Sequence, residues 1–597
     1  MHVLLAPAPC VMPCTGMEVF KAYTADIWRR TKDALPVTAL LIAMGAVVEG
    51  IGIAAILPFA ALITGQTESL AADSVMQMLR SAGITSQFGR ALALSAGFAA
   101  FLAVRAVIIW QRDTRLYWLG FHYVDGVRSR LFRAIGTADW MTVRTLRRAD
   151  LEHAITNDIA RLGIGTDRLL RGGAAAAMAA VQLAIIALLA PMLLALVFLL
   201  LALAAMLALP MMRKAGALGN RLTLSGRHVH AVLGDFLASQ KLARLNNAED
   251  AFLGRFESAI RDVRAHQNRF YRSQTAARLW FQLIAGLVVI GALVIGFFVL
   301  ETPLPILAVT LVVLARLVNP VQTIVQSAQS ISNTLPAFSA IEETVTRLER
   351  AAREIIDIGA AAKPLDPKPA QLTLSNICFS HSAGTLPERA AVKAFDLHVG
   401  AGDIVALNGP SGSGKTTVLD IITGLLPPAS GTIAVNGTVL STETDFARWR
   451  RHICYLPQDP FLFDASIRDN LTWHHNGVSD DAIWQALETA EIAAFVSGLP
   501  GGLDSSVGDR GGNLSGGERQ RLCIAAAVIN APRFLILDEA TNALDVELER
   551  QVLANLFRQR DRFSILLVTH RPEALRHADR VITVNHRRTP PVQQNNR

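Results

Sequence analysis

The stretch GPSGSGKTT at residues 409–417 decides the fold of the C-terminal part of the chain. It follows the apolar run IVAL at 404–407 and precedes a helix that we predict to begin near Lys415. Glycines let backbone N–H groups curl around phosphate oxygens, and the N-terminus of the next helix adds partial positive charge. Strand, loop and helix in this order predict an α/β P-loop NTPase domain. Its predicted nucleotide contacts are Gly409, Pro410, Ser411, Gly412, Ser413, Gly414, Lys415, Thr416 and Thr417.

A second apolar strand pattern, FLILDEA at 534–540, ends in two acidic residues. Asp538 is expected to hold Mg²⁺ together with the hydroxyl of Thr416, while Lys415 reaches the β- and γ-phosphates. Glu539 is suited to orient and deprotonate the attacking water. An acidic strand end is ordinary by itself, but about 120 residues after a phosphate-binding loop it indicates nucleotide hydrolysis.

Between these two stretches lies LSGGERQR at 514–521, in which two glycines precede a predicted helix and make a second anion-seeking N-terminus. This fragment resembles the signature sequence of the ABC ATPases. The resemblance covers 370–585, and the family's other motifs follow in its usual order. They are Gln458 in YLPQDPFLF (455–463) for the Q-loop, VGDRG (507–511) for the X-loop, NALD (542–545) for the D-loop and His570 in LLVTHR (566–571) for the switch histidine.

The resemblance implies a site built from two chains, which hydrolyses ATP with Mg²⁺. The implied catalytic residues are Lys415, Gln458, Glu539 and His570, and the implied Mg²⁺ set is Thr416, Gln458 and Asp538. Two ATPase domains would dimerise head to tail, so that each ATP lies between Lys415 of one chain and Ser515, Gly516 and Gly517 of the other. The partner is expected to be a second copy of the chain or a related half-transporter.

Several positions depart from the family's pattern. His381 stands at the adenine-stacking position, where Tyr is usual, Glu518 replaces the commoner Gln of the signature, and Asn542 replaces the usual Ser of the D-loop. None of these changes removes an essential group. The chain also ends in VNHRRTPPVQQNNR (584–597), where relatives usually add a strand and a helix.

The N-terminal part has the composition of a membrane domain. The chain is 51% hydrophobic and only 18% charged, with a mean hydropathy of +0.35, whereas soluble chains carry about 25% charged residues. Each apolar run is long enough to cross a bilayer core of about 30 Å. We therefore predict an α-helical domain with six crossings, at about 34–64, 91–110, 172–190, 192–212, 281–300 and 302–326, with a tight turn at Pro191.

The distribution of Lys and Arg sets the predicted orientation. Basic residues precede the first crossing and are abundant in the two long connections, 111–171 and 213–279. Both termini and both connections are therefore expected in the cytoplasm. In these connections, 149–162 and 240–252 resemble the two coupling helices of exporters. The predicted domains are a cytoplasmic segment 1–33, an exporter membrane domain 34–345, a linker 346–369 and the ATP-binding domain 370–597.

Three charged residues lie inside the predicted crossings: Glu49, Arg105 and Arg316. A charge at the bilayer centre costs about 3 kcal/mol, so such residues usually face a cavity or a partner. Two interpretations stay open. The three residues line a substrate cavity, or they form an ion pair between helices, for example between Arg316 and Glu49, unless an Arg snorkels from a misjudged boundary.

These features together predict a homodimeric, multi-pass exporter or flippase in the inner membrane of a bacterium, with the ATPase domain in the cytoplasm. The net charge of +8 is explained by cytoplasmic loops rather than by nucleic-acid binding. Five cysteines indicate no disulfide framework. The substrate class stays open among lipid, lipid-linked glycan, modified peptide and hydrophobic drug. The rival functions are a nucleotide-gated channel or regulator and a non-transporting ABC ATPase.

Overall fold

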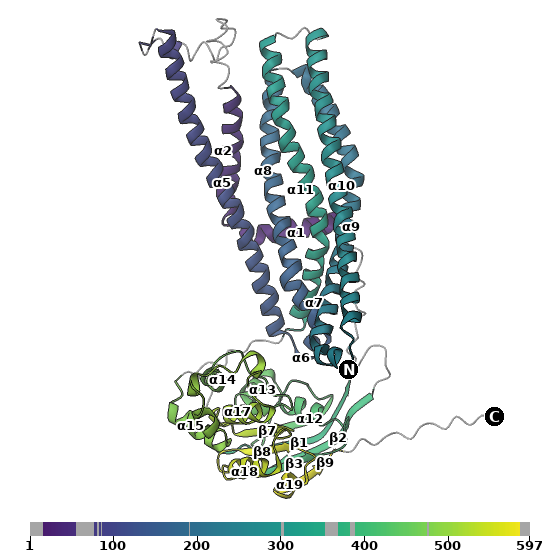
Figure 1. Cartoon of the computed structure of the whole chain (residues 1–597), viewed down its shortest axis with the longest axis vertical. Coiled ribbons are helices and arrows are strands. Elements are labelled where there is room, and N and C mark those ends of the chain that lie inside the picture. The colour runs from purple at the N-terminus through teal and green to yellow at the C-terminus, as the bar shows by residue number, and fades with distance from the viewer. Residues whose placement is uncertain are drawn as a thin grey trace, which may run out of the picture. The chain divides into compact units, whose positions relative to one another are not determined.

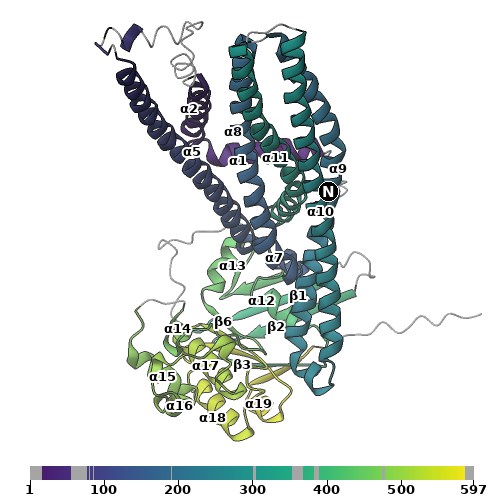
Figure 2. The same cartoon turned by 45° about the horizontal axis from the view of Figure 1, so that its top comes forward.

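The computed structural model describes residues 16–54, 86–189, 191–299, 304–352, 368–381, 389–473 and 477–584, with a few positions between 77 and 84. The chain divides into two compact units. The first comprises Met1–Ala138 and Thr142–Ala352, and the second comprises Asp139–Met141 and Arg353–Arg597. The described part of the first unit is helical, and the second contains all the described strands (Figures 1 and 2).

Long helices make up the first unit. Five of them have between 31 and 55 residues. At 1.5 Å per residue, a 50-residue helix is about 75 Å long and extends far beyond a bilayer core. This length confirms that the helices continue past the predicted crossings. The elements are α1 (Gly16–Thr31), α2 (Leu35–Ala54), α5 (Gln87–Thr137), α8 (Ile159–Leu189), α9 (Pro191–Leu245), α10 (Glu249–Phe298) and α11 (Leu304–Arg350).

The predicted crossings coincide with these helices. Among the described residues, four helices are long and apolar enough to cross a membrane; one contains the second predicted crossing, and the other three overlap the third, fifth and sixth. The first crossing begins in α2, which meets α1 at a bend of 106°, and its last part, 55–64, lies outside the described residues. The fourth lies in α9, which begins at Pro191 as predicted. Residues 301–303, at the junction of the fifth and sixth predicted crossings, also lie outside them.

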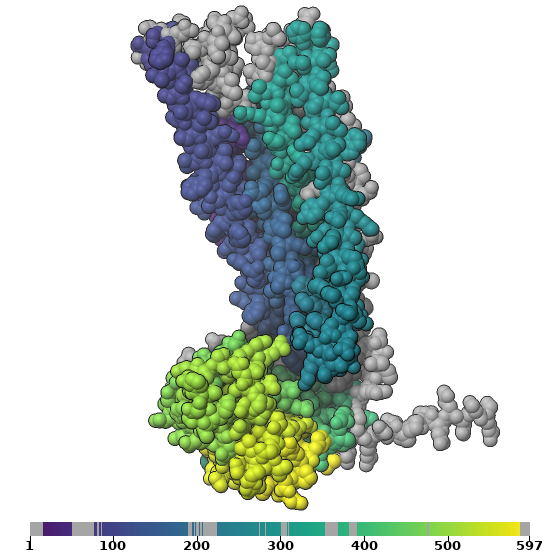
Figure 3. Space-filling view, in the orientation of Figure 1, coloured from purple at the N-terminus to yellow at the C-terminus, as the bar shows by residue number. Residues whose placement is uncertain are grey.

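Small residues allow the closest packing in the bundle, between α8 and α11. A Cβ on Gly165 would lie 2.5 Å from the Thr334 side chain, and one on Gly172 would lie 2.8 Å from the Ser327 Cβ. Small residues at such contacts let helix backbones approach closely where lipid removes the hydrophobic driving force. Figure 3 shows the outer surfaces of α5, α10 and α11. Many large apolar side chains of α5 and α10 are exposed there, as expected for lipid-facing helices.

The first connection corrects one prediction. The chain reverses at 138–147, around the short helix α6 (Trp140–Thr145), rather than at 149–162. Residues 149–162 instead form α7 (Arg148–His153), a π-helical turn (Ala154–Asp158) and the start of α8. The reason is packing, because Ala154, Ile159 and Leu162 are buried in a core cluster with side chains of α1, α5 and α11. These apolar residues hold the segment in the bundle.

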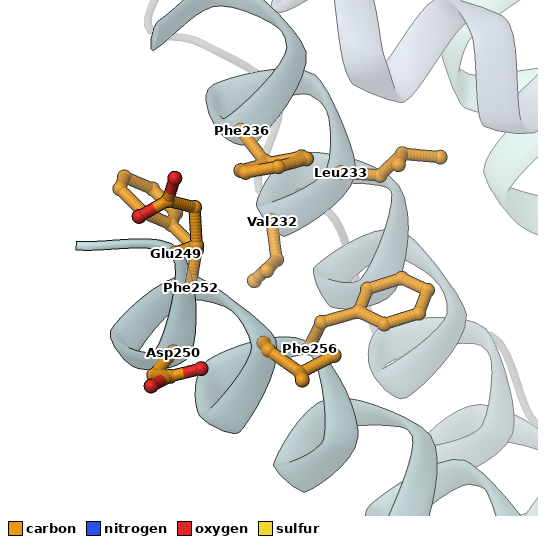
Figure 4. A pocket seen from close by; sticks show the side chains of 8 residues that line it. Val232, Leu233, Phe236, Glu249, Asp250, Phe252 and Phe256 are labelled. Carbon is orange, nitrogen blue, oxygen red and sulfur yellow. The ribbon is translucent and has the colours of Figure 1, made fainter. Parts of the chain in front are cut away.

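The second connection reverses within the predicted segment 240–252, since α9 ends at Leu245 and α10 begins at Glu249. Phe252 and Phe256 lie one turn apart on α10. Both rings line an apolar hollow of about 330 Å³ between the two helices (Figure 4). Phe236 of α9 lies opposite Phe252, with ring centroids 5.5 Å apart. At the other end of the unit, α11 runs on to Arg350, past the predicted start of the linker at 346.

Two sheets form the framework of the second unit. The strands are β1 (Leu372–His381), β2 (Arg389–Val399), β3 (Ile404–Asn408), β4 (Ser430–Val435), β5 (Thr438–Val439), β6 (Ile453–Leu456), β7 (Phe534–Asp538), β8 (Ser564–Val568) and β9 (Arg580–Thr583). An antiparallel sheet has the order β2-β1-β4-β5, and a parallel sheet has the order β6-β7-β8-β3-β9. Each of the central parallel strands has four consecutive apolar residues and one polar residue at an end, as expected for strands covered on both faces.

Helices cover the parallel sheet on two sides. One core cluster joins the two sheets to α12 (Lys415–Ile422) and α13 (Glu443–Arg450), and Trp449 is its largest buried side chain. The other joins the parallel sheet to the remaining helices. These are α14 (Ile467–Thr472), α15 (Asp480–Thr489), α16 (Ala493–Ser497), α17 (Gly516–Ile529), α18 (Val546–Phe557) and α19 (Pro572–Arg576). The predicted α/β domain is confirmed.

Candidate functional site

The order of the parallel strands brings the predicted catalytic motifs together. β7, β8 and β3 are neighbours, although β3 precedes β7 by more than a hundred residues in the chain. All three are parallel, so their carboxyl ends meet at one edge of the sheet. Ligands of open α/β sheets bind at that edge. The phosphate loop follows β3, the acidic pair ends β7, and His570 follows β8.

The phosphate loop, residues 409–414, has a backbone that only glycine tolerates at three points. Gly409, Gly412 and Gly414 have φ values of +155°, +78° and +100°. A Cβ on Gly414 would also lie 2.5 Å from the Ala391 carbonyl oxygen. The hydroxyl of Ser413 is buried and lacks a hydrogen-bond partner among the described residues. An orphaned donor inside a glycine cradle fits the phosphate oxygens of ATP.

Lys415 links the phosphate loop to the end of β8. Its Nζ donates to the carbonyl oxygens of Gly409 at 2.7 Å and Pro410 at 3.2 Å, and lies 3.3 Å from Nε2 of His570. An ammonium with three donors can exchange these carbonyls for phosphate oxygens without moving its backbone. The geometry therefore agrees with the predicted phosphate-binding role.

Asp538 and Glu539 occupy different environments at the end of β7. Tyr455 Oη donates to Asp538 Oδ2 at 2.9 Å. Burial raises the pKa of Asp538, and the neighbouring charge of Glu539 adds to that rise, while Tyr455 and Lys415 oppose it. Glu539 has a left-handed backbone with φ +50°. Its Oε1 lies 3.5 Å from Nε2 of His570. One carboxylate is thus held by a tyrosine hydroxyl, and the other faces the histidine.

Sequence reasoning missed three residues that contact this site. Tyr455 belongs to the Q-loop motif, and its hydroxyl holds Asp538. Asn542, noted as a departure from the family, donates its Nδ2 to Glu539 Oε2 at 2.8 Å. Arg571 donates to the carbonyl oxygens of Asn542 and Leu544, so it ties the D-loop (542–545) to the end of β8. Only Asn542 carried a signal in the sequence, as the unusual first residue of the D-loop.

The signature segment contacts the D-loop. Ser515 caps α17, because its hydroxyl accepts from the Glu518 N–H, while Glu518 Oε2 accepts from the Ser515 N–H at 2.7 Å. This reciprocal capping box explains why Glu suits position 518. A Cβ on Gly517 would lie 3.3 Å from the Ala543 carbonyl oxygen, and Gln520 accepts from the Ala543 N–H. Ser515 itself is exposed.

Three further predicted site residues lie at the margins of the edge. Thr416 is exposed in the first turn of α12, beside Lys415. Gln458 is exposed just beyond the end of β6, the strand next to β7. His381 is the last residue of β1 and pairs in register with Arg389, but its side chain lies outside the described residues. Their roles stay predictions.

The three charged residues inside the predicted crossings lie in different surroundings. Glu49 of α2 and Arg105 of α5 form an ion pair of 3.1 Å and are 19% and 31% exposed. The partner of Glu49 in the described structure is thus Arg105, and the suggested pairing of Glu49 with Arg316 is wrong. Arg316 is exposed on α11. None of the three lines either of two cavities in the helical unit, the one between α9 and α10 or the one between α5, α8 and α11, and their place in a substrate cavity stays a prediction.

Replacing Tyr455 by Phe tests how Asp538 is held. The variant loses a hydrogen bond to a carboxylate, worth on the order of 1 kcal/mol. We expect the Mg²⁺ concentration for half-maximal ATP hydrolysis to rise several-fold. The pKa of Asp538 should rise further, because Tyr455 stabilises the ionised form. A protonated carboxyl does not bind Mg²⁺, so on lowering the pH the variant should lose Mg²⁺ affinity at a higher pH than the parent.

The measurement is an Mg²⁺ titration of ATPase activity at several pH values. Tyr271→Phe is the matched control, since the Tyr271 side chain is 60% exposed on α10. Equal Mg²⁺ dependence in the parent and the Tyr455→Phe variant would show that Tyr455 does not position Asp538.

Comparisons with known proteins show which proteins this site resembles. Residues 392–542 match the family described as ABC transporter. An ATP-dependent lipid A-core flippase of Ralstonia nicotianae is 43% identical over 201 residues, 33% of this chain and 34% of the flippase. The flippase of Burkholderia thailandensis is 30% identical over 356 residues, 59% of this chain and 58% of the flippase. The chain thus spans about a third to somewhat over half of the length of these flippases.

The fold has a counterpart among solved structures. A bacterial Atm1-family ABC exporter with ATP bound matches 93% of this chain and 94% of its own, with a TM-score of 0.76 and 21% identity. This match covers both units. It confirms the predicted fold, a helical domain followed by an α/β domain.

Proposed function

We propose that this chain, whose residues 392–542 belong to the ABC transporter family, is one subunit of a dimeric, ATP-driven exporter or flippase. The observation that carries the proposal is the meeting of Lys415, Glu539 and His570 at one sheet edge, in a chain whose other unit has several helices able to cross a membrane. ATP hydrolysis in a multi-pass membrane protein is most simply coupled to movement across that membrane.

The residues at this edge of the sheet have different roles in ATP hydrolysis. The phosphate loop and Lys415 bind and neutralise the phosphates. Glu539 accepts the proton of the attacking water, and His570, which faces both Lys415 and Glu539, contacts the terminal phosphate. Asn542 holds Glu539 through its amide until ATP is bound. Thr416, Asp538 and Gln458 would hold Mg²⁺, which supplies positive charge to the developing phosphate oxygens.

The signature segment supports a dimer. The N-terminus of α17 offers backbone donors and partial positive charge, yet its contacts described above are with the D-loop. A second copy in head-to-tail arrangement would present Ser515, Gly516 and Gly517 to the phosphate loop of the first. The partner is therefore taken to be a second copy of the chain, although a related half-transporter would serve the same geometry.

Mixing two inactive variants tests the composite site. Lys415→Ala should abolish phosphate binding, and Gly517→Asp should place a negative charge where phosphate binds. In a head-to-tail mixed dimer both defects fall in one site, so the other site is intact. Co-expressed, differently tagged chains purified through both tags should retain one tight ATP per dimer and a partial ATPase rate. A mixed dimer as inactive as its parents would place each complete site within one chain.

Transport is tested in proteoliposomes. The purified chain should move a lipid or hydrophobic substrate between leaflets only when ATP and Mg²⁺ are present, and vanadate should stop it. A relative described as a mitochondrial potassium channel ATP-binding subunit, from Pongo abelii, is 35% identical over 226 residues, so a channel subunit is the second candidate. ATP-dependent ion flux without lipid movement would favour that function. Release from the membrane by carbonate would instead favour a non-transporting ATPase.

The proposed location is the inner membrane, with the ATPase unit in the cytoplasm. The abundance of Lys and Arg in 111–171 and 213–279 supports this orientation. Membrane lipid is then the immediate environment of α5 and α10, whose apolar side chains are exposed over much of their length. Accessibility of single cysteines to a membrane-impermeant reagent, at the 246–248 reversal, would establish the sidedness.

A further inference from the structure

Polar side chains join the start of α8 to α9 inside the helical unit. They come from the end of α7, from the π-helical turn that follows it and from α9, and they are His153, Asn157, Asp158, Arg227 and His230. We call these five residues the polar joint. His153 is 2% exposed and Asp158 is 0% exposed. All five lie in the two long connections, 111–171 and 213–279, and none of them belongs to the nucleotide site.

One carboxylate lies at the centre of the polar joint. Asp158 Oδ2 lies 3.3 Å from Nδ1 of His153 and 3.6 Å from Nη2 of Arg227. Its other oxygen, Oδ1, lies 4.0 Å from Nη1 of Arg161 and accepts no hydrogen bond among the described residues. One carboxylate thus faces two guanidinium groups. The polar joint and Arg161 together carry one excess positive charge while both imidazoles are neutral.

The two imidazole rings are held in an arrangement that suits their neutral forms. The rings of His153 and His230 are T-shaped, with centroids 5.4 Å apart. Nδ2 of Asn157 donates to Nε2 of His230 at 2.6 Å, so this ring nitrogen accepts and carries no proton. Nε2 of His153 faces Gly226, where a Cβ would lie only 2.8 Å away, and it has no hydrogen-bond partner in the described structure. A neutral His153 already supplies the Nδ1 proton that Asp158 accepts.

A second proton on either ring is unfavourable in this arrangement. On His230 the proton would point at the amide nitrogen of Asn157, which is itself a donor. On His153 it would point toward Gly226, where the described residues offer no acceptor. Each added proton also increases an excess positive charge in a buried site, and burial penalises charge that is not neutralised.

The groups next to the polar joint do not supply the missing negative charge. From α7, α8, α9 and α10 respectively, these groups are Glu152, Arg161, His228 and His266. Glu152 is exposed and pairs with Arg148, and α11 meets Arg161 through a backbone carbonyl oxygen. Among the described residues, Asp158 is the only carboxylate within ion-pair distance of Arg227.

The polar joint fastens a pair of helices to the rest of the bundle. α9 and α10 reverse at 246–248 and contain the fourth and fifth predicted crossings. α8 and α9 are consecutive in the chain, but their connection at residue 190 is at the opposite end of α8 from the joint. The joint therefore holds the start of α8 against α9 where no chain connection does. π-helical turns such as 154–158 are frequent at functional sites.

We propose that the polar joint is a proton-sensitive latch, which is closed while both imidazoles are neutral and opens on acidification, so that the α9–α10 pair is released and ATP-driven turnover slows. Imidazoles exchange protons between about pH 5 and 8. Water solvates the added protons in the open latch, so lowering the pH through this range shifts the population toward the open state. Chains with an open latch leave the cycle, and the rate falls with the closed fraction. The link to turnover, but not the latch itself, rests on the proposed exporter function.

A distance measurement on the purified full chain in detergent, without nucleotide, tests the latch. The native cysteines are replaced, and nitroxide labels are placed at Ala160→Cys on α8 and Leu224→Cys on α9, both exposed and outside the joint. Labelled chains are diluted with unlabelled chains, so that pulsed EPR reads the distance within one chain. Between about pH 8 and about pH 5.5 the short-distance population should fall at least about threefold, as expected when opening is linked to proton uptake by two imidazoles.

The double variant His153→Gln with His230→Gln removes the proton-sensitive groups. Glutamine is neutral at both pH values, and its amide can donate to Asp158 or accept from Asn157, so the short-distance population should stay constant. His228→Gln is the matched control, because His228 is exposed on α9 outside the joint, and it should keep the pH response of the parent. Each variant must bind a fluorescent ATP analogue like the parent, which shows that it is folded. If the double variant does not fold, His230→Gln alone should show a reduced pH response.

ATPase rates of the parent and of the double variant, at the same two pH values, test the consequence for turnover. The rates should agree at about pH 8. At about pH 5.5 the parent should be at least about threefold slower than the double variant, in proportion to the lost closed fraction. The nucleotide site is the same in both chains, so the comparison removes the direct effect of pH on that site.

A distance that ignores pH in the parent, or that changes equally in the double variant, would overturn the latch. Opening at low pH with equal ATPase rates in the two chains would overturn its link to turnover. Neither measurement uses a transported substrate. A failure of movement in proteoliposomes would therefore contradict the proposed exporter function and leave the latch intact.

Discussion

Glu539→Gln is expected to bind ATP as tightly as the parent and to hydrolyse it at least about 100-fold more slowly, because the variant lacks the base that accepts the proton of water. The amide keeps the shape of the side chain, and it can still contact Asn542, which donates to Oε2 of the parent carboxylate at 2.8 Å. ATP should then hold the two ATPase domains together. The measurements are the steady ATPase rate and the fraction of chains that remain dimeric after exchange into ATP.

Glu547→Gln is the matched control for this change. Glu547 is an exposed glutamate of α18 that lies eight residues after Glu539 in the chain. It pairs with Arg550 outside the site. Its removal should leave hydrolysis unchanged. If Glu539→Gln turned over ATP at close to the parental rate, Glu539 would not be the base, and the orientation of the water would have to come from His570 or Gln458.

Arg571→Met is expected to destabilise the ATPase domain by about 3 kcal/mol or more, because it leaves a buried carboxylate without its partner. Glu549 is 2% exposed, accepts from Arg571 at 2.7 Å and accepts from Thr541 Oγ1 at 2.6 Å. The same guanidinium holds the D-loop carbonyl oxygens of Asn542 and Leu544. Loss of Arg571 should therefore loosen the D-loop first, and with it the hold of Asn542 on Glu539.

Hydrogen exchange of the full chain measures this effect locally, in peptides that cover 541–549. The double variant Arg571→Met with Glu549→Met should recover most of the protection, since it removes the unpaired charge. Arg576→Met is the control, because Arg576 pairs with Glu573 on the surface and such pairs contribute little. Equal exchange in the parent and the Arg571→Met variant would mean that water already solvates Glu549.

The nucleotide-site residues at the carboxyl edge of the parallel sheet were predictable because each motif is a short stretch whose own residues indicate its chemistry. The glycines at 409, 412 and 414 are needed for φ values that other residues avoid, so their spacing reveals the loop before its neighbours are known. Asp538 is the last residue of a strand that is otherwise apolar, and Glu539 follows it, which makes two adjacent acidic residues at the end of a buried strand. The family's order of motifs then assigned Gln458 and His570 to the same site.

The contacts that hold these groups could not be predicted in the same way. Tyr455 reaches Asp538 across 83 residues of chain because β6 and β7 are neighbours in the sheet, and strand order is not encoded in any one stretch. Arg571 reads as an ordinary basic residue after a strand. Its role depends on Glu549 and the D-loop. These follow β7 in the chain, whereas Arg571 follows β8.

In the membrane unit, hydropathy and charge located the crossings, because a bilayer imposes the same length and composition on every helix that spans it. They did not locate the reversal at 138–147. The amphipathic pattern of 149–162 fits either a reversal or a helix of the bundle, and only its packing against α1, α5 and α11 keeps it in the bundle. Nor did they show that Glu49 pairs with Arg105 or that Arg112, Arg168 and Arg171 share one cavity. The sequence alone determined the kinds of unit, their order and the nucleotide chemistry, which depend on local pattern. Tertiary structure alone decided which charges meet, because rotation and sliding of one helix against another change side-chain partners while leaving hydropathy unchanged.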